Sequence, residues 1–140
     1  MSSPESQRTF VLLKPDTVRR GLVGTVLDRF ERRGLRVVAM EQRTIDGELA
    51  DQHYAEHVER DFYPPLRAFV TSGPVVALVL EGDQAIEVVR GLNGATDGRK
   101  AAPGTIRGDF SLSNRENLVH GSDSAESAER EIGIWFPGLV

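Results

Sequence analysis

The six apolar residues from Val75 to Leu80 form the clearest strand of the chain and constrain its fold most. They are bounded by Pro74 on one side and by Glu81-Gly82-Asp83 on the other. A continuous apolar run of this length, ended by turn-forming residues, is typical of a buried strand. The segments on either side of this strand therefore decide which architecture surrounds it.

Those segments alternate between strand-like and helix-like patterns. Apolar runs predict further strands at residues 9–13, 35–40 and 118–119. Apolar residues at helical spacing, with start and stop signals, predict helices over residues 22–30, after Asp46 as a cap, from Pro64-Pro65 to Gly73-Pro74, over residues 86–92, and from Ala125 to Trp135. Gly34 stands where a left-handed stop belongs, and Lys14-Pro15-Asp16 reads as a turn.

This order of elements predicts an α+β fold in the wider α/β class. Two interleaved right-handed crossovers give a split β-α-β sandwich of the ferredoxin-like type, with four mainly antiparallel strands and helices on one face. A length of 140 residues, of which 39% are hydrophobic, suits a single domain over residues 1–140, with residues 1–8 flexible. Residues 93–116 show no sustained periodicity, and a loop of this length is usually functional or disordered.

Composition excludes several classes of function. The chain contains no cysteine, so disulfides, thiolate nucleophiles and cysteine-bound metal centres are excluded. A net charge of -4 makes nucleic acid an unlikely partner. The polar N-terminus has no signal-peptide core, and the longest apolar run is too short to span a membrane. We therefore expect a cytoplasmic protein without a membrane partner.

The stretch Asn117-Leu118-Val119-His120-Gly121-Ser122-Asp123 is the most informative one for function. It places an imidazole after a short strand and directly before a helix, for which Asp123 is the expected cap and Glu126 completes a capping box. The first turn of a helix favours anions, so a phosphate is expected near His120. The alternative is a partly buried histidine that only ends a strand.

Further phosphate ligands are spread through the chain. Lysine is scarce, since the 17 basic residues include only Lys14 and Lys100, and Lys14 directly follows a predicted strand. Arg90, Thr96 and Arg107 are additional candidates because a guanidinium group can bind two phosphate oxygens. Coding bias towards arginine also explains the scarcity of lysine, and each arginine alone fits a solvated surface group or a partner of a helix dipole. No Walker or dinucleotide-binding motif is present.

Four ordered motifs together resemble the nucleoside diphosphate kinase family. They are Phe10-Val11-Leu12-Leu13-Lys14-Pro15-Asp16, Thr71-Ser72-Gly73-Pro74-Val75-Val76-Ala77, Pro103-Gly104-Thr105-Ile106-Arg107-Gly108-Asp109, and the His120 stretch continued to Ile132. The resemblance runs in one register from about Thr9 to Phe136, and the stretch around His120 is its most specific part.

The resemblance implies an ATP:nucleoside-diphosphate phosphotransferase. The γ-phosphate, mainly of ATP, would pass by a ping-pong route to the pros nitrogen of His120 and then to a nucleoside diphosphate. A histidine has an ordinary pKa of about 6.5, so it is largely neutral and nucleophilic at neutral pH. The implied supporting residues are Lys14, Arg90, Thr96 and Arg107 for the phosphates, Tyr54 near the histidine, Glu131 as its orienting carboxylate, Ser122 beside that carboxylate, and Asn117 with Lys14 for the sugar hydroxyl. Mg²⁺ would be held mainly by the nucleotide, with Asp123 and Glu56 nearby through water.

The resemblance also implies broad substrate use. Phe62 matches the aromatic ring on which the base stacks and Leu66 its apolar neighbour, although both also fit the core of a helical hairpin. Stacking tolerates every base, so ATP, GTP, CTP, UTP, the deoxynucleotides and their diphosphates are the expected partners. Two other classes compete with this reading, namely a regulatory nucleotide-binding module and a DNA- or RNA-binding protein. His120 argues against the first, and the acidic balance argues against the second.

Three residues depart from the common pattern of the family. Thr17 replaces a glycine, Gly98 replaces a proline and is expected to loosen the loop, and Asn114 replaces an apolar contact to the base. The chain also ends at Val140, without the longer tail that some members have. We expect a homo-oligomer, with a hexamer as first choice and a tetramer or dimer as second.

Overall fold

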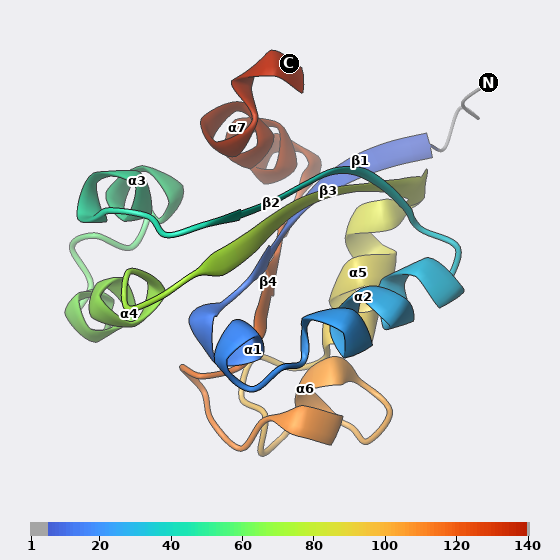
Figure 1. Ribbon diagram of the computed structural model, residues 1–140, viewed down its shortest axis with the longest axis horizontal. Coiled ribbons are helices and arrows are strands. Elements are labelled where there is room, and N and C mark those ends of the chain that lie inside the picture. The colour runs from blue at the N-terminus through green and yellow to red at the C-terminus, as the bar shows by residue number, and fades with distance from the viewer. Residues whose placement is uncertain (1–5, 140) are drawn as a thin grey trace.

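The computed structural model describes residues 6–139, which form a four-stranded sheet with helices around it (Figure 1). The strands are β1 (Ser6–Leu13), β2 (Arg36–Arg43), β3 (Val75–Asp83) and β4 (Val119–Gly121), in the order β2-β3-β1-β4 with every neighbouring pair antiparallel. The helices are α1 (Pro15–Arg19), α2 (Val23–Arg32), α3 (Gly47–His53), α4 (Tyr63–Val70), α5 (Ala85–Asn93), α6 (Ile106–Phe110), α7 (Ala125–Trp135) and the 3-10 helix η1 (Pro137–Leu139). The predicted split β-α-β fold is confirmed.

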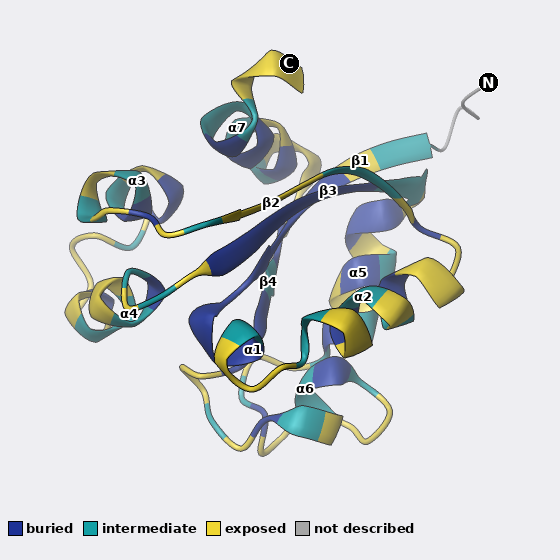
Figure 2. Cartoon of the chain, in the orientation of Figure 1, coloured by how far each residue is buried: buried dark blue, intermediate teal, exposed yellow. Residues whose placement is uncertain are grey.

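Helices cover both faces of the sheet, so the prediction of one covered face was wrong. Alternate residues of β1 point to opposite sides: Val11 packs with α2 and α5, whereas Phe10 packs with α3, α4 and α7. Both faces of β1 and β3 are apolar over most of the length of these strands, so each face of the sheet packs against helices. Figure 2 shows mostly buried strands β1, β3 and β4 between helices whose outer faces are exposed, whereas the edge strand β2 is exposed or half-buried.

Two short helices replace segments that were expected to be irregular. Pro15 begins α1 where a turn was predicted, since the fixed φ of proline suits a first helical position. Helix α6 lies inside the long loop, and Thr105 caps it by accepting a hydrogen bond from the Gly108 N–H at 3.0 Å. Both helices have only five residues, too few to show an apolar period.

The start of α7 also differs from its prediction. Ser124, not Asp123, is the cap, and its Oγ accepts from the Ser127 N–H at 3.0 Å. The backbone stays extended at Ser124, so the helix begins one residue later than a cap at Asp123 would allow. The predicted cap of α3 is confirmed, because Asp46 Oδ1 accepts from the Leu49 N–H at 2.9 Å.

The predicted flexible N-terminus is partly outside the described residues, which begin at Ser6. Ser6 to Arg8 instead form the first part of β1 and pair with β3. An ion pair between Arg8 and Glu81, at 2.9 Å, and a hydrogen bond from the Ile86 N–H to the Gln7 side chain hold this part of the strand. Among residues 6–139, no helix has the length and apolar character needed to cross a membrane.

Candidate active site

Two adjoining cavities are lined by nearly all the residues that the sequence predicted for the active site. The inner cavity has a volume of about 240 Å³ and is lined, among others, by Lys14, Tyr54, Glu56, Arg90, Thr96, Arg107, Asn117, His120, Asp123 and Glu131. An adjoining cavity of about 530 Å³ is lined by Phe62 and Leu66 and shares Lys14, Thr96 and Asn117 with the first. Ser122 is the nominated residue that lines neither cavity, because it is fully buried behind Glu131.

His120 lies in the middle of β4 and is held by a buried carboxylate from α7. Its Nε2 is 2.9 Å from Glu131 Oε1, and the Ser122 hydroxyl donates to the same oxygen at 2.7 Å. A carboxylate oxygen accepts hydrogen bonds, so the ring proton of neutral His120 belongs on Nε2. The lone pair of a neutral His120 is then on Nδ1.

Lys14, at the end of β1, is a buried cation. Its Nζ donates to Asn117 Oδ1 at 2.8 Å, and the Asn117 amide donates to the Thr96 carbonyl at 2.9 Å. Burial, and then the positive charge of Arg107, lower the pKa of Lys14 to about 8, while Asp16 opposes the shift. Lys14, Thr96 and Asn117 therefore form one connected wall of the site.

Arg107 is fixed by the backbone around it. Its guanidinium donates to the carbonyls of Asn117, Gly94 and Val119, at 3.2, 2.8 and 2.6 Å. A guanidinium has five N–H donors, so two remain for a ligand in the cavity. Burial, followed by the charge of Arg90, lowers the pKa of Arg107 to about 10. The alternative of a solvated surface arginine is wrong for Arg107.

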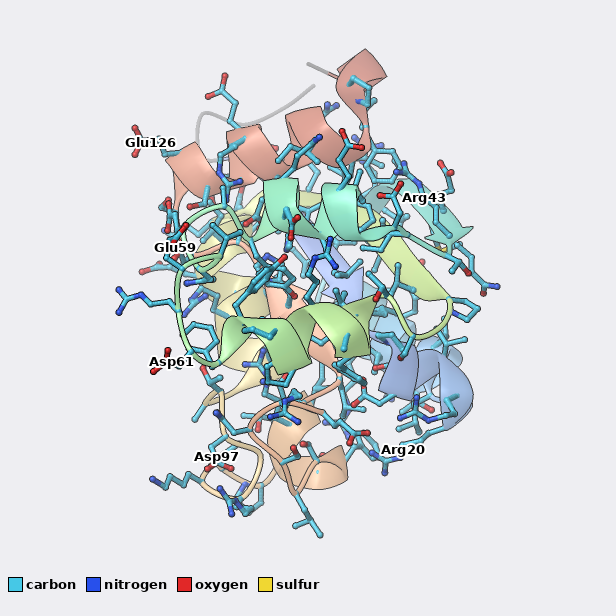
Figure 3. The ribbon with its side chains drawn as sticks, turned by 90° about the vertical axis from the view of Figure 1, so that its left-hand side faces the viewer. Arg20, Arg43, Glu59, Asp61, Asp97 and Glu126 are labelled. Atoms are coloured by element: carbon cyan, nitrogen blue, oxygen red, sulfur yellow. The ribbon has the colours of Figure 1, made fainter. Side chains whose placement is uncertain are left out.

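Arg90 projects into the cavity from the last turn of α5. Its NH1 group lies 3.4 Å from the Gly121 carbonyl, next to His120 on β4. Four cationic side chains, those of Lys14, Arg90, Arg107 and Arg130, thus line a small cavity in a chain whose net charge is -4. Exposed acidic residues such as Glu59, Asp61 and Glu126 lie at the periphery of the molecule in Figure 3.

The segment before His120 has a strained backbone that sequence analysis missed. Leu118 has a φ of 74°, in the left-handed region that bulky residues rarely adopt. Its N–H donates to Asp16 Oδ2 at 3.1 Å, and its carbonyl accepts from the Thr17 hydroxyl at 2.6 Å. The Thr17 hydroxyl thus connects α1 to the residue directly before β4. No local signal reveals these contacts, because the partners lie about one hundred residues apart.

His53 and Tyr54, at the end of α3, form the wall beside His120. Tyr54 was predicted from the sequence to lie near His120, but His53 was not, although its ring is 4.6 Å from that of His120 between centroids. The Tyr54 hydroxyl is buried and has no hydrogen-bond partner among residues 6–139. Burial, and then the charge of Glu131, raise the pKa of Tyr54, so its hydroxyl stays protonated and can donate.

The outer cavity has an aromatic edge. Phe62 is 52% exposed, so the alternative that it belongs to the core of the helical hairpin is wrong, and Tyr63 and Val70 fill that core instead. Leu66 and Asn114 also line this cavity. Gly98 was expected to loosen its loop. Its N–H donates to the Ser113 carbonyl at 3.0 Å, and a Cβ at this position would lie 2.5 Å from the Ser111 carbonyl oxygen. The hydrogen bond to Ser113 and the close packing against Ser111 therefore fix the loop at Gly98.

Comparisons with known proteins agree with this geometry. The family model for nucleoside diphosphate kinase matches residues 7–139. A nucleoside diphosphate kinase from a Nocardioides species is 80% identical over 96% of this chain and 99% of its own length, and one from Cutibacterium acnes is 60% identical over 97% and 99%. A solved nucleoside diphosphate kinase from Halobacterium salinarum, in complex with CDP, superimposes with a TM-score of 0.91 at 50% identity, covering 94% of this chain and 88% of that one. The chain therefore belongs to the nucleoside diphosphate kinase family, whose enzymes transfer phosphoryl groups between nucleotides.

Proposed function

We propose that His120 carries the phosphoryl group in a ping-pong reaction, with Nδ1 of its imidazole as the nucleophile. The observation that carries this proposal is the 2.9 Å contact between His120 Nε2 and Glu131 Oε1. The Glu131 carboxylate accepts a hydrogen bond from the Nε2–H group. The Nδ1 lone pair is therefore available to attack phosphorus. Ser122 supports the arrangement by donating to the same carboxylate oxygen.

The reaction balances in two half-steps. In the first, a bond forms between Nδ1 and the γ-phosphorus of ATP while the bond from that phosphorus to the β–γ bridging oxygen breaks, and ADP leaves. In the second, a terminal phosphate oxygen of a different nucleoside diphosphate attacks the phosphorus, and the N–P bond breaks. The Nε2 proton stays next to Glu131 throughout, so no separate base is required.

Charge neutralisation is the main remaining requirement of phosphoryl transfer. Arg107 has two N–H donors beyond its three backbone bonds, and Arg90 and Thr96 line the same cavity. We assign these three residues to the phosphates and Tyr54 to an oxygen of the transferred group. Lys14 serves both the phosphates and, with Asn117, the sugar 3'-hydroxyl, which fits its position between the two cavities.

Nucleotide kinases generally need a divalent metal, and we propose Mg²⁺ here. Carboxylate oxygens suit this ion, and Asp123 and Glu56 both line the inner cavity. The pKa of Asp123 is lowered, first by a hydrogen bond with the Ser127 side chain, so its carboxylate is charged at neutral pH. Asp123 and Glu56 would hold the ion through water. When bound with the nucleotide, the ion neutralises phosphate charge.

Broad nucleotide specificity is part of the proposal. Phe62 presents half of its surface to solvent at the outer cavity, where Leu66 adds an apolar contact. Stacking on an aromatic ring discriminates weakly between bases, so ATP, GTP, CTP, UTP and their deoxy forms should all serve. We further propose a homo-oligomer, hexamer before tetramer or dimer, that acts in the cytoplasm.

Incubation with γ-labelled ATP and Mg²⁺ tests the proposed intermediate. The protein should acquire one alkali-stable, acid-labile label per chain, which any nucleoside diphosphate removes. His120→Gln should abolish labelling while the protein still binds a fluorescent nucleotide analogue. A folded wild-type protein that never becomes labelled would refute the proposal.

A further inference from the structure

His53 is a fully enclosed histidine beside the proposed nucleophile that the mechanism above does not use. Its ring lies edge-on to that of His120, with centroids 4.6 Å apart and an angle of 78° between the planes. Phe10 and Tyr54 enclose it further, at centroid distances of 5.6 and 4.5 Å. Only 2% of His53 is exposed, so contact with bulk solvent does not explain why a polar ring occupies this position.

Trp135 sets the tautomer of His53. The indole Nε1–H lies 3.0 Å from His53 Nδ1, and an indole nitrogen can only donate. Nδ1 must therefore be the acceptor, which places the ring proton on Nε2. Burial, and then the positive charges of neighbours including His120 and Arg130, lower the pKa of His53 well below its ordinary value, so the ring stays neutral.

This tautomer argues against a metal between the neighbouring side chains. His53, His120 and Glu131 each place a ligand atom within 4.8 Å of the others. However, Nδ1 of His53 is occupied by Trp135, and a protonated Nε2 has no lone pair for a metal. The Nε2–H group has no hydrogen-bond partner among residues 6–139, and the ring forms part of the wall of the inner cavity.

We propose that His53 is a positioning residue for His120, held in one tautomer by Trp135 and packed edge-on against the nucleophilic ring. Glu131 fixes His120 at Nε2, but one hydrogen bond still permits the ring to tilt about it. The edge of His53 supplies the second point of support, which directs Nδ1 towards the phosphates. Because His53 is neutral, it gives this support without placing another cation beside the nucleophile.

Helices α3 and α7, which carry His53 and Glu131, also contact each other directly. Arg130 on α7 contacts the His53 carbonyl at 3.4 Å and lies 3.7 Å from Glu131 Oε2. Trp135, one helical turn after Glu131, reaches His53 from the same helix. Helix α7 thus holds both groups that contact His120, so their mutual positions are set by one rigid element.

Two substitutions separate positioning from simple packing, and the inference rests on the proposed phosphohistidine mechanism. His53→Asn places an amide oxygen near the former Nδ1, so it can still accept from Trp135, but it removes the ring edge. We expect it to retain most of the thermal stability while the single-turnover labelling of His120 slows about 10- to 100-fold, with little change in KM for ATP. His53→Phe keeps a ring but loses the acceptor, so we expect a lower Tm and a smaller loss of labelling rate.

Trp135→Phe provides a matched test of the tautomer. It keeps an aromatic ring next to Phe10 but removes the N–H donor together with one ring of the buried indole. ¹⁵N NMR should therefore show His53 changing from one tautomer to a mixture, with labelling slowed several-fold. Wild-type labelling rates in His53→Asn, or equal losses of rate and stability that stabilising salts restore together, would overturn the positioning role. Wild-type protein that cannot be labelled would instead refute the proposed mechanism, so the two failures are distinguishable.

Discussion

At the scale of single residues, burial sets the pH range over which Lys14 can bind phosphate. The pKa of Lys14 is lowered to about 8, first by desolvation and then by Arg107, so the side chain is still mainly protonated at pH 7. A bound phosphate favours the charged form and raises this pKa again. The free enzyme and the nucleotide complex should therefore respond differently to alkaline pH.

We predict that kcat/KM for ATP falls above about pH 8, while kcat stays level to higher pH. The reason is that kcat/KM reports the free enzyme, in which Lys14 loses its proton, whereas kcat reports the complex, in which phosphate keeps it charged. Steady-state kinetics between pH 6.5 and 10, in buffers of constant ionic strength, measure both profiles. A kcat/KM that stays flat to pH 10 would contradict the assignment of Lys14 to the phosphates.

The residues of the site differ in how far the sequence could predict them. Chemistry and local position made His120, Lys14 and Arg107 candidates, the family resemblance favoured them over the structural alternatives, and the structure places all three in one cavity. Glu131 and Ser122 required the family resemblance, because nothing local connects them to an imidazole. His53 and Asp16 were missed, since their roles depend on contacts with residues about 80 to 100 positions away.

At the scale of elements, α6 shows how a very short helix can position a ligand-binding side chain. Five residues are too few to form a stable helix alone, so its cap matters. The Thr105 hydroxyl accepts from the Gly108 N–H at 3.0 Å and donates to the Ala102 carbonyl at 2.7 Å. Arg107 lies within this capped turn, so we expect the cap to help hold the Arg107 side chain in its orientation towards the phosphates.

Thr105→Ala should lower the free energy of unfolding by about 0.5–2 kcal/mol through loss of this cap. It should also raise KM for ATP, because Arg107 is no longer held in one orientation. Thr105→Ser keeps the hydroxyl and should leave KM close to that of the wild type. Urea denaturation and steady-state kinetics on the three proteins provide the check, and a destabilised Thr105→Ala variant with an unchanged KM would disprove the link.

The elements with long apolar patterns were predicted, whereas two very short helices were not. The strand at Val75 was predicted from a continuous apolar run and the helix before Gly34 from apolar periodicity, with ends that differ by only a few residues. Helices α1 and α6 have no period to detect, and they depend on Pro15 and Thr105 at their first turns. The cap of α7 moved to Ser124 because either of two adjacent polar residues can cap a helix.

At the scale of the whole molecule, the sheet separates two hydrophobic cores, and we expect them to differ in how strongly they affect the position of His120. Phe30 belongs to the core beneath α2 and α5, and Phe10 to the core beneath α3, α4 and α7. The sequence already contained the signal that both faces are covered, since residues 10–13 are apolar without alternation. Which helix covers which face depends on the path of each crossover, and single-sequence patterns do not report that path directly.

Phe10 and Tyr54, whose rings lie near that of His120, belong to the core beneath α3, α4 and α7. The Phe10 ring is 5.2 Å from that of Trp135, 5.6 Å from that of His53 and 6.2 Å from that of His120, measured between centroids. Phe10→Leu and Phe30→Leu should each lower the free energy of unfolding by about 1–3 kcal/mol, since both rings are fully buried. Labelling by γ-labelled ATP, normalised to the folded fraction from urea denaturation, should slow in Phe10→Leu and remain near the wild-type rate in Phe30→Leu. If both variants slow equally, the two cores share the support of His120, and the expected difference between them is wrong.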